Sequence, residues 1–95
     1  MVLIQWDTRK SEINFKKHGV LFEEAATTFF DTKKVEFFDK LHSQFEDRFW
    51  VIGRSNTGRV LLVVYSWRKS SVQKKEYYRI ISARIAKASE GGHSD

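Results

Sequence analysis

The spacing of apolar residues along this chain changes from a strand-like to a helical period and back again. Residues 1–6 form a short apolar run that predicts a first strand. Helical spacing then predicts a helix over residues 8–18, with Asp7 as its N-cap and Gly19 in the left-handed conformation that ends it. A second helix is predicted over residues 22–30, where Phe and Ala residues form one apolar face.

Beyond the second helix the apolar period falls to two, which is typical of β-strands. The predicted strands cover residues 34–39, 48–54, 59–67 and 76–84. Polar segments separate them: a turn at 41–46, a hairpin turn at 55–58 and a basic loop at 68–75. The order β-α-α-β-β-β-β predicts an α+β fold, in which two N-terminal helices pack on one face of a mostly antiparallel sheet. The other face would be left partly open, so a functional site could lie there.

Arginines stand at the ends of two predicted strands, and strand parity predicts which face each one takes. Arg48 and Arg54 share a face because six positions separate them. Arg79 and Arg84 differ by five positions, so in a regular strand they point to opposite faces. They can line one groove only if a β-bulge intervenes or one of them lies beyond the end of the strand.

The composition indicates a small globular protein. Its 95 residues are 41% hydrophobic and 15% aromatic, which predicts one domain over residues 1–88 and a disordered, Gly-containing tail over 89–95. The absence of cysteine excludes disulfides and thiolate zinc sites. The chain has no signal-peptide pattern and no apolar run of the ~18 residues that span a membrane, so we expect a cytoplasmic protein.

The charge is unevenly distributed, and its excess is positive. The formal net charge is +5, and residues 68–87 hold seven Lys and Arg residues against Glu76 alone. Such a basic half suggests an anionic partner, either a nucleic acid or an acidic protein. The three histidines have no metal-ligand spacing, so we expect neither a metal nor another cofactor.

Five side chains are candidates for phosphate chemistry. Arg54, Arg79 and Arg84 could hold a phosphoryl oxygen, although spacing alone favours solvated arginines that pair with nearby acids. His42 and Glu46 could act as base and acid in attack by a ribose 2′-hydroxyl, but residues in a polar loop are more often simply exposed. Several aromatic residues could stack on bases, or equally could pack in the core: Trp50, Trp67, Tyr77 and Tyr78.

Short segments spread over residues 4–86 stand in a specific order, although each is weak alone. They are Trp6-Asp7, Asn14, Lys17-His18-Gly19-Val20, Phe22-Glu23-Glu24-Ala25, Asp31, the loop 42–48, Ile52-Gly53-Arg54-Ser55, Gly58-Arg59, Val64-Tyr65 and Arg79-Ile80-Ile81-Ser82-Ala83-Arg84. As a set they resemble the BrnT family of type II toxins.

The resemblance implies a RelE-like fold and an endoribonuclease that inhibits translation by cleaving RNA. It implies a BrnA-like antitoxin with a ribbon-helix-helix DNA-binding region, in a heterotetramer. Because the open face of so small a domain would be basic and exposed, we also expect the antitoxin to cover it with apolar and acidic groups. The matching site positions are Arg54, Arg79 and Arg84, with His42 and Glu46 as further members; we expect the reaction to be metal-independent. The basic residues expected to contact RNA are Lys17, Arg48, Arg59, Lys74 and Lys75.

The chain departs from the family pattern at three places. Leu21 replaces a small N-cap residue, Ile85 replaces a basic residue, and a short tail replaces a charged C-terminal helix. Two other functions therefore stay open beside the ribonuclease. One is a non-catalytic basic module that binds nucleic acid or protein, and the other is a degenerate toxin that keeps only the fold and antitoxin binding.

Overall fold

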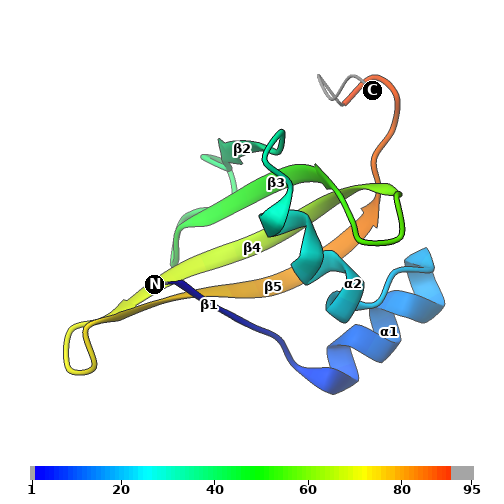
Figure 1. The fold of residues 1–95 in the computed structure, drawn as a ribbon. Coiled ribbons are helices and arrows are strands. Elements are labelled where there is room, and N and C mark those ends of the chain that lie inside the picture. Colours follow the sequence, from blue (N-terminus) through cyan, green and yellow to red (C-terminus); the bar gives the residue numbers. More distant parts are fainter. Residues whose placement is uncertain (1, 91–95) are drawn as a thin grey trace.

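A computed structural model describes residues 2–90 of the chain (Figure 1). The elements in chain order are β1 (Val2–Gln5), α1 (Thr8–His18), α2 (Phe22–Ala26), a 3₁₀ turn η1 (Thr27–Phe30), β2 (Val35–Phe38), β3 (Arg48–Arg54), β4 (Val60–Ser70) and β5 (Lys75–Ile85). The predicted order of elements is confirmed. The bounds of α1 are the predicted ones, because the side chain of Asp7 accepts from the backbone N–H of Lys10 and Gly19 has a φ of 73°.

One five-stranded sheet, in the order β1-β5-β4-β3-β2, forms one layer of the fold. The pairs β5-β4, β4-β3 and β3-β2 are antiparallel, and β1 pairs parallel with β5. Both helices lie over the same face of the sheet, away from the β4–β5 hairpin (Figure 1). We call this the helix face and the opposite one the open face. The predicted α+β architecture is thus confirmed.

The core lies between the helices and the helix face. Its largest fully buried side chains come from both layers, with Phe22 from the segment of α2 and Tyr65, Leu61 and Val63 from β4. Alternate residues of β4 supply this face, as the two-residue period requires. Removal of this apolar surface from water is the main term that holds the helices on the sheet.

The predicted second helix divides into two parts. α2 ends at Ala26, and a 3₁₀ turn continues to Phe30. The hydroxyls of Thr27 and Thr28 donate to the carbonyls of Glu24 and Ala25, at 2.6 and 2.7 Å. Such bonds from Thr to the preceding turn compete with regular helix geometry, which accounts for the tighter turn.

The start of α2 depends on another element. Leu21 has no capping side chain, as its apolar type predicts. Instead, the buried hydroxyl of Ser11 in α1 accepts from the backbone N–H of Phe22 at 2.8 Å. The cap of the second helix is therefore supplied by the first.

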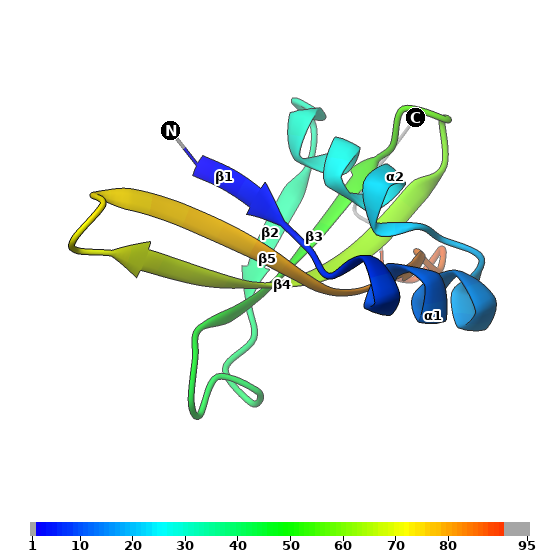
Figure 2. The ribbon, with the colours of Figure 1, turned by 90° about the horizontal axis from the view of Figure 1, so that it is seen from below.

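The basic segment at 68–75 is mostly strand rather than loop. β4 continues to Ser70 and β5 begins at Lys75, so the turn covers only residues 71–74. The hairpin extends well beyond the rest of the sheet (Figure 2). The prediction of a long loop was wrong because pairing of the two strands satisfies backbone hydrogen bonds that local polarity does not reveal.

A bulge in β5 sets the faces of its arginines. The register of β4 against β5 shifts between Val64, which pairs with Ser82, and Tyr65, which pairs with Ile80. Ile81 is thus an extra residue that reverses the parity of β5. Arg79 pairs with Ser66 and Arg84 with Leu62, and these two β4 residues share a face. The bulge considered from the sequence therefore exists, and both arginines belong to the open face.

The end of the described chain turns back onto the sheet. Glu90 lies in a turn where its carboxylate accepts from the Lys87 backbone N–H at 2.7 Å and from the Arg84 guanidinium. Glu90, the second residue of the predicted tail, is thus fixed by these hydrogen bonds. Residues 91–95, which include His93, lie outside the described residues. Within residues 2–90, no helix is long and apolar enough to cross a membrane.

Candidate active site

A hollow of about 300 Å³ lies on the open face, and we call it the open-face hollow. Side chains from β3, β4, β5 and the segment between β2 and β3 line it. The lining residues are Asp39, His42, Arg48, Trp50, Leu62, Val64, Ile81, Ser82 and Arg84. Two cations, one histidine and an exposed indole therefore surround an apolar floor.

His42 is oriented by a carboxylate. Its Nδ1 lies 2.8 Å from Oδ2 of Asp39, which also accepts from Nε1 of Trp50 at 3.0 Å. Burial acts to raise the pKa of Asp39, but the hydrogen bonds from Trp50 and His42 outweigh it, so the pKa lies below its ordinary value. An ionised carboxylate only accepts, so Nδ1 of His42 is the donor in this contact and Nε2 is the nitrogen left to meet a substrate. The His42 side chain is 65% exposed and can therefore meet a substrate.

Arg48 is linked to a second carboxylate. One of its terminal nitrogens lies 3.6 Å from Glu46, which also accepts from Arg68 at 3.1 Å. Among the described residues, the Nε of Arg48 is one of two buried side-chain polar atoms without a hydrogen-bond partner. The buried Nε cannot reach a ligand, but the guanidinium is held near the hollow by Glu46, and that one contact does not use all the donors of its terminal nitrogens.

Arg84 forms the opposite wall, and a carboxylate of the same chain already contacts it. Two of its nitrogens donate to the two oxygens of Glu90, one at 2.7 Å. This hydrogen bonding lowers the pKa of Glu90 to about 2, so Glu90 is charged at neutral pH. Paired donation to two oxygens is also how a guanidinium recognises a phosphate. The contact shows that Arg84 presents its donors in a geometry that suits an oxyanion.

Two other predicted arginines lie outside this hollow. Arg79 lines a separate hollow with Gln5, Trp6 and Thr8, beside the β1 edge. Like Arg48, it pairs with Ser66, but it lies on the other side of β4, and both are about 13 Å along the sheet from Arg84. Arg54 lies at the end of β3 and donates to the carbonyl of Gly58 at 2.8 Å. The structure thus brings together His42, Arg48 and Arg84, with Glu46 behind Arg48.

Comparison with known proteins shows which family this chain belongs to. The profile described as "Ribonuclease toxin, BrnT, of type II toxin-antitoxin system" matches residues 6–90. This chain belongs to that family. The crystal structure of the Brucella abortus ribonuclease toxin BrnT, at 1.1 Å resolution, is similar to it with a TM-score of 0.63. The similarity covers 92% of this chain and 97% of the other, at 27% identity. No curated protein sequence matches.

Membership of the BrnT family confirms the resemblance, and it makes this chain a ribonuclease-toxin homologue with an antitoxin partner. The two helices on a mostly antiparallel sheet are shared with the Brucella structure. The family does not assign a role to any residue of this chain. The geometry of the open-face hollow must therefore carry the choice of catalytic groups.

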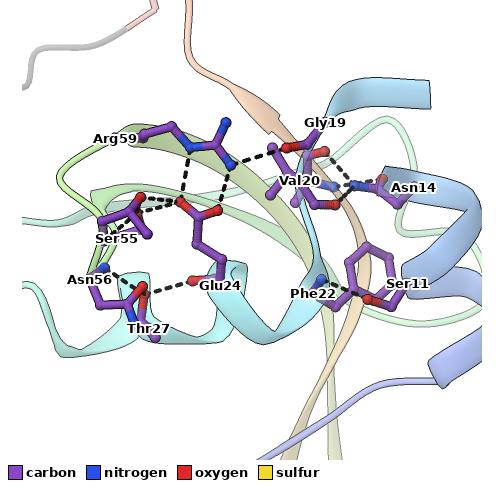
Figure 3. A network of polar contacts seen from close by, with 12 residues as sticks. Ser11, Asn14, Gly19, Val20, Phe22, Glu24, Thr27, Ser55, Asn56 and Arg59 are labelled. Atoms are coloured by element: carbon purple, nitrogen blue, oxygen red, sulfur yellow. Dashed lines mark hydrogen bonds and ion pairs between the residues drawn. The ribbon is translucent and has the colours of Figure 1, made fainter. Parts of the chain in front are cut away.

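The predicted RNA contacts other than Arg48 lie away from the hollow. Lys17 is exposed in the last turn of α1, and Lys74 and Lys75 stand at the β4–β5 hairpin. Arg59 is held in a polar network with Glu24 of α2 (Figure 3). It donates to Glu24 and to the carbonyl of Gly19, at 3.0 and 3.1 Å. These four contacts stay predictions.

Sequence reasoning did not propose Asp39 or Ser82 as part of a site. Asp39 orients His42 three residues later, a spacing that a carboxylate and a histidine in one turn could have suggested. Ser82 reaches the hollow because of the bulge at Ile81, for which the sequence carries no local signal. Within residues 2–90, no three His, Cys, Asp or Glu side chains converge to hold a metal ion.

Proposed function

We propose that this protein is an endoribonuclease that cuts RNA in the open-face hollow by a metal-independent reaction in the cytoplasm. The observation that supports this is the convergence of His42, Arg48 and Arg84 from three segments of the chain on one hollow. Phosphodiester transfer can be catalysed by a base, which a carboxylate orients here, together with cations that stabilise the phosphate, which are two guanidinium groups here.

In this reaction Arg48 and Arg84 hold the scissile phosphate and stabilise the charge that builds on its oxygens. Nε2 of His42 removes the proton of the adjacent 2′-hydroxyl, and Asp39 stabilises the imidazolium that forms. The 2′ oxygen bonds to phosphorus as the bond to the 5′ oxygen breaks, and the 5′ oxygen takes a proton from water. The products are a 2′,3′-cyclic phosphate and a 5′-hydroxyl.

Arg79 has a different role in this proposal because it lines a different hollow. Arg79 and Arg84 both lie on the open face, but Arg79 lies beside the β1 edge with Gln5 and Thr8. Arg79 would hold the RNA backbone one or more nucleotides from the cut, beside Trp6, whose ring is partly buried against the core. Arg79 is thus a binding residue in this proposal rather than a catalytic one.

The test is cleavage of a labelled single-stranded RNA by the purified protein in EDTA, with product ends identified by mass spectrometry. We expect a cyclic phosphate end. The cleavage rate of His42→Ala and of Arg84→Ala should be lower than that of the wild type by a factor of at least about 100. His18→Ala and Arg9→Ala are matched controls, because both residues are exposed on α1. Arg79→Ala should weaken RNA binding more than it slows the bound cleavage step.

Three results would contradict the proposal. Full activity in His42→Ala would remove the assigned base. Growth arrest by a protein that leaves RNA intact in EDTA would point to another target or to a metal-dependent reaction. RNA binding without cleavage would favour the non-catalytic module, in which the arginines position RNA and perform no chemistry.

We also propose that the antitoxin is BrnA-like, carries a ribbon-helix-helix region and joins two toxins in a heterotetramer. This rests on the family resemblance, and on an open face where exposed Trp50 and Phe37 lie near Arg48 and Arg84. Light scattering on the complex gives its mass. If the antitoxin covers this face, Arg84→Ala should make its affinity less sensitive to salt, and an unchanged salt dependence would contradict that contact.

A further inference from the structure

A second hollow lies on the helix face and differs in character from the open-face hollow. Its volume is about 280 Å³, and we call it the acidic aromatic pocket. The lining residues are Glu36, Phe49, Tyr65, Trp67, Glu76 and Tyr78. They lie toward the β4–β5 hairpin, beyond the part of the sheet that α1 and α2 cover in Figure 1. The pocket is thus open on a face that the proposed reaction does not use.

Aromatic rings form a continuous lining for this pocket. Tyr65 packs against Tyr78 with ring centroids 4.7 Å apart and against Phe49 at 5.6 Å with a stacked geometry. Phe29 of η1 closes the side toward the helices, since its ring lies 5.0 Å from that of Tyr65. Tyr65 itself is buried, and these contacts fix Phe49 and Tyr78, so the accessible parts of those two rings offer a rigid electron-rich surface with little entropy left to lose on binding.

The two carboxylates at this lining are oriented by the aromatic residues themselves. The hydroxyl of Tyr65 donates to Glu36 at 2.6 Å, and Nε1 of Trp67 donates to Glu76 at 3.2 Å. Each carboxylate has further lone pairs to offer. Burial first, and then the negative charges of Glu36 and Glu76, raise the pKa of Tyr78. The pocket is therefore negative in a protein whose net charge is +5.

The lysines of the protein neutralise the negative charge of this pocket only weakly. Nζ of Lys34 lies 3.8 Å from Glu36, at the limit of an ion pair, and both side chains are partly exposed. Lys69 pairs in register with Glu76, but within residues 2–90 no ion pair joins them. Such an exposed contact is readily exchanged for a cation that also meets the rings.

We propose that the acidic aromatic pocket binds an arginine or lysine side chain of the antitoxin, with arginine preferred. A planar guanidinium can stack its plane on an aromatic ring and donate two parallel hydrogen bonds to a carboxylate, whereas an ammonium group is a point charge with no plane to stack. Phosphate would be repelled by Glu36 and Glu76, and the sheet separates the pocket from the open-face hollow, so RNA fits poorly. Glu36 lies on the edge strand β2, so an antitoxin segment that crosses this edge reaches both faces. The proposal rests on family membership and does not require ribonuclease activity.

The first test follows the indole N–H of Trp67 by NMR in the full chain, with N-acetylargininamide as the probe. We expect a saturable shift for Trp67 and none for Trp6, which lies beside Arg79. N-acetylcitrullinamide is the matched control, because its side chain has the same shape and no charge. Its affinity should be at least about tenfold lower. Glu36→Gln/Glu76→Gln should lower the affinity for argininamide by a similar factor, and glutamine can still accept the Tyr65 and Trp67 hydrogen bonds.

The second test measures the affinity of the full chain for its antitoxin. We expect Glu36→Gln/Glu76→Gln to weaken the complex about tenfold or more, while RNA cleavage by the free toxin is unchanged. Glu12→Gln/Glu23→Gln removes the same charge from exposed helix positions and is the control. An unchanged antitoxin affinity would overturn the partner, and equal binding of the citrulline probe would overturn the site. Saturation of the Trp67 shift by GMP alone would assign the pocket to a nucleotide instead.

Discussion

Glu24 joins α2 to the turn between β3 and β4, and its replacement by glutamine gives a quantitative prediction. Its carboxylate accepts from two nitrogens of Arg59, including Nε at 3.0 Å, and from the hydroxyls of Ser55 and Thr57 at 2.6 Å each (Figure 3). Glutamine keeps the size and one acceptor oxygen but removes the charge. The substitution therefore removes the charge of this network and turns one of its two acceptor atoms into a donor.

The magnitude follows from the pKa of this carboxyl group. The hydrogen bond from Arg59, opposed by burial and assisted by Ser55 and Thr57, lowers the pKa of Glu24 from 4.5 to about 2. At about 1.4 kcal/mol per pKa unit, this corresponds to an upper bound of roughly 3 kcal/mol. The Glu24 side chain is 14% exposed, but that of Arg59 is 37% exposed, so water screens the pair. We expect Glu24→Gln to lower the free energy of unfolding by about 2 kcal/mol at pH 7.

The pH dependence gives the prediction a sign. The pKa of Glu24 is lower in the folded chain, so the unfolded chain binds more protons between pH 4.5 and about 2. The stabilisation is present above pH 4.5 and is lost as the pH falls toward 2. Urea unfolding of the wild type and Glu24→Gln at a series of pH values from 7 to 2.5 measures this. The difference between their free energies of unfolding should shrink over that window.

Glu23→Gln is the matched control, because it removes the same charge from the same turn of α2 at an exposed position. Both substitutions change the interaction with the helix dipole, so their difference isolates the Arg59 network. A loss below about 0.5 kcal/mol for Glu24→Gln, or a difference from the wild type that does not change with pH, would refute the reasoning.

Two further predictions concern buried and terminal contacts. Asn14 donates to the carbonyls of Val20 and Ala83, both at 2.8 Å, and accepts from the Ala83 N–H. Asn14→Leu leaves these groups unpaired, so thermal or urea unfolding should show a loss of about 2–4 kcal/mol, and a loss under 1 kcal/mol would contradict the role of these bonds. Glu90→Gln frees the guanidinium of Arg84. RNA affinity should rise several-fold in a filter-binding assay, with Glu12→Gln as control, and unchanged affinity would show that Glu90 does not compete with phosphate.

The helices show which parts of the fold depend on local chemistry. α1 has its predicted bounds because both of its ends are set by neighbours in sequence, Asp7 at the start and Gly19 at the end. α2 lacks such a cap at Leu21, and its first free N–H is satisfied by Ser11 from another helix. Its end was predicted four residues too late, because Thr27 and Thr28 bond back to the preceding turn.

The candidate site depends on contacts that are distant in sequence. His42, Arg48 and Arg84 were each candidates as residues, but nothing in their spacing showed that they line one hollow while Arg54 and Arg79 line others. The register of β5 decides this, and the extra residue in β5 reverses which side chains face outward. The acidic aromatic pocket likewise joins residues from four strands.

The sequence by itself determined the order of elements, the bounds of α1, the family and the residue types available for phosphate chemistry. These follow from apolar periodicity, capping residues and short motifs, all of which act over a few positions. The tertiary structure alone decided which of those residues share a face. Strand pairing fixes faces through hydrogen bonds between distant segments, and one inserted residue reverses them, so no local pattern could place Arg79 and Arg84 together on the open face.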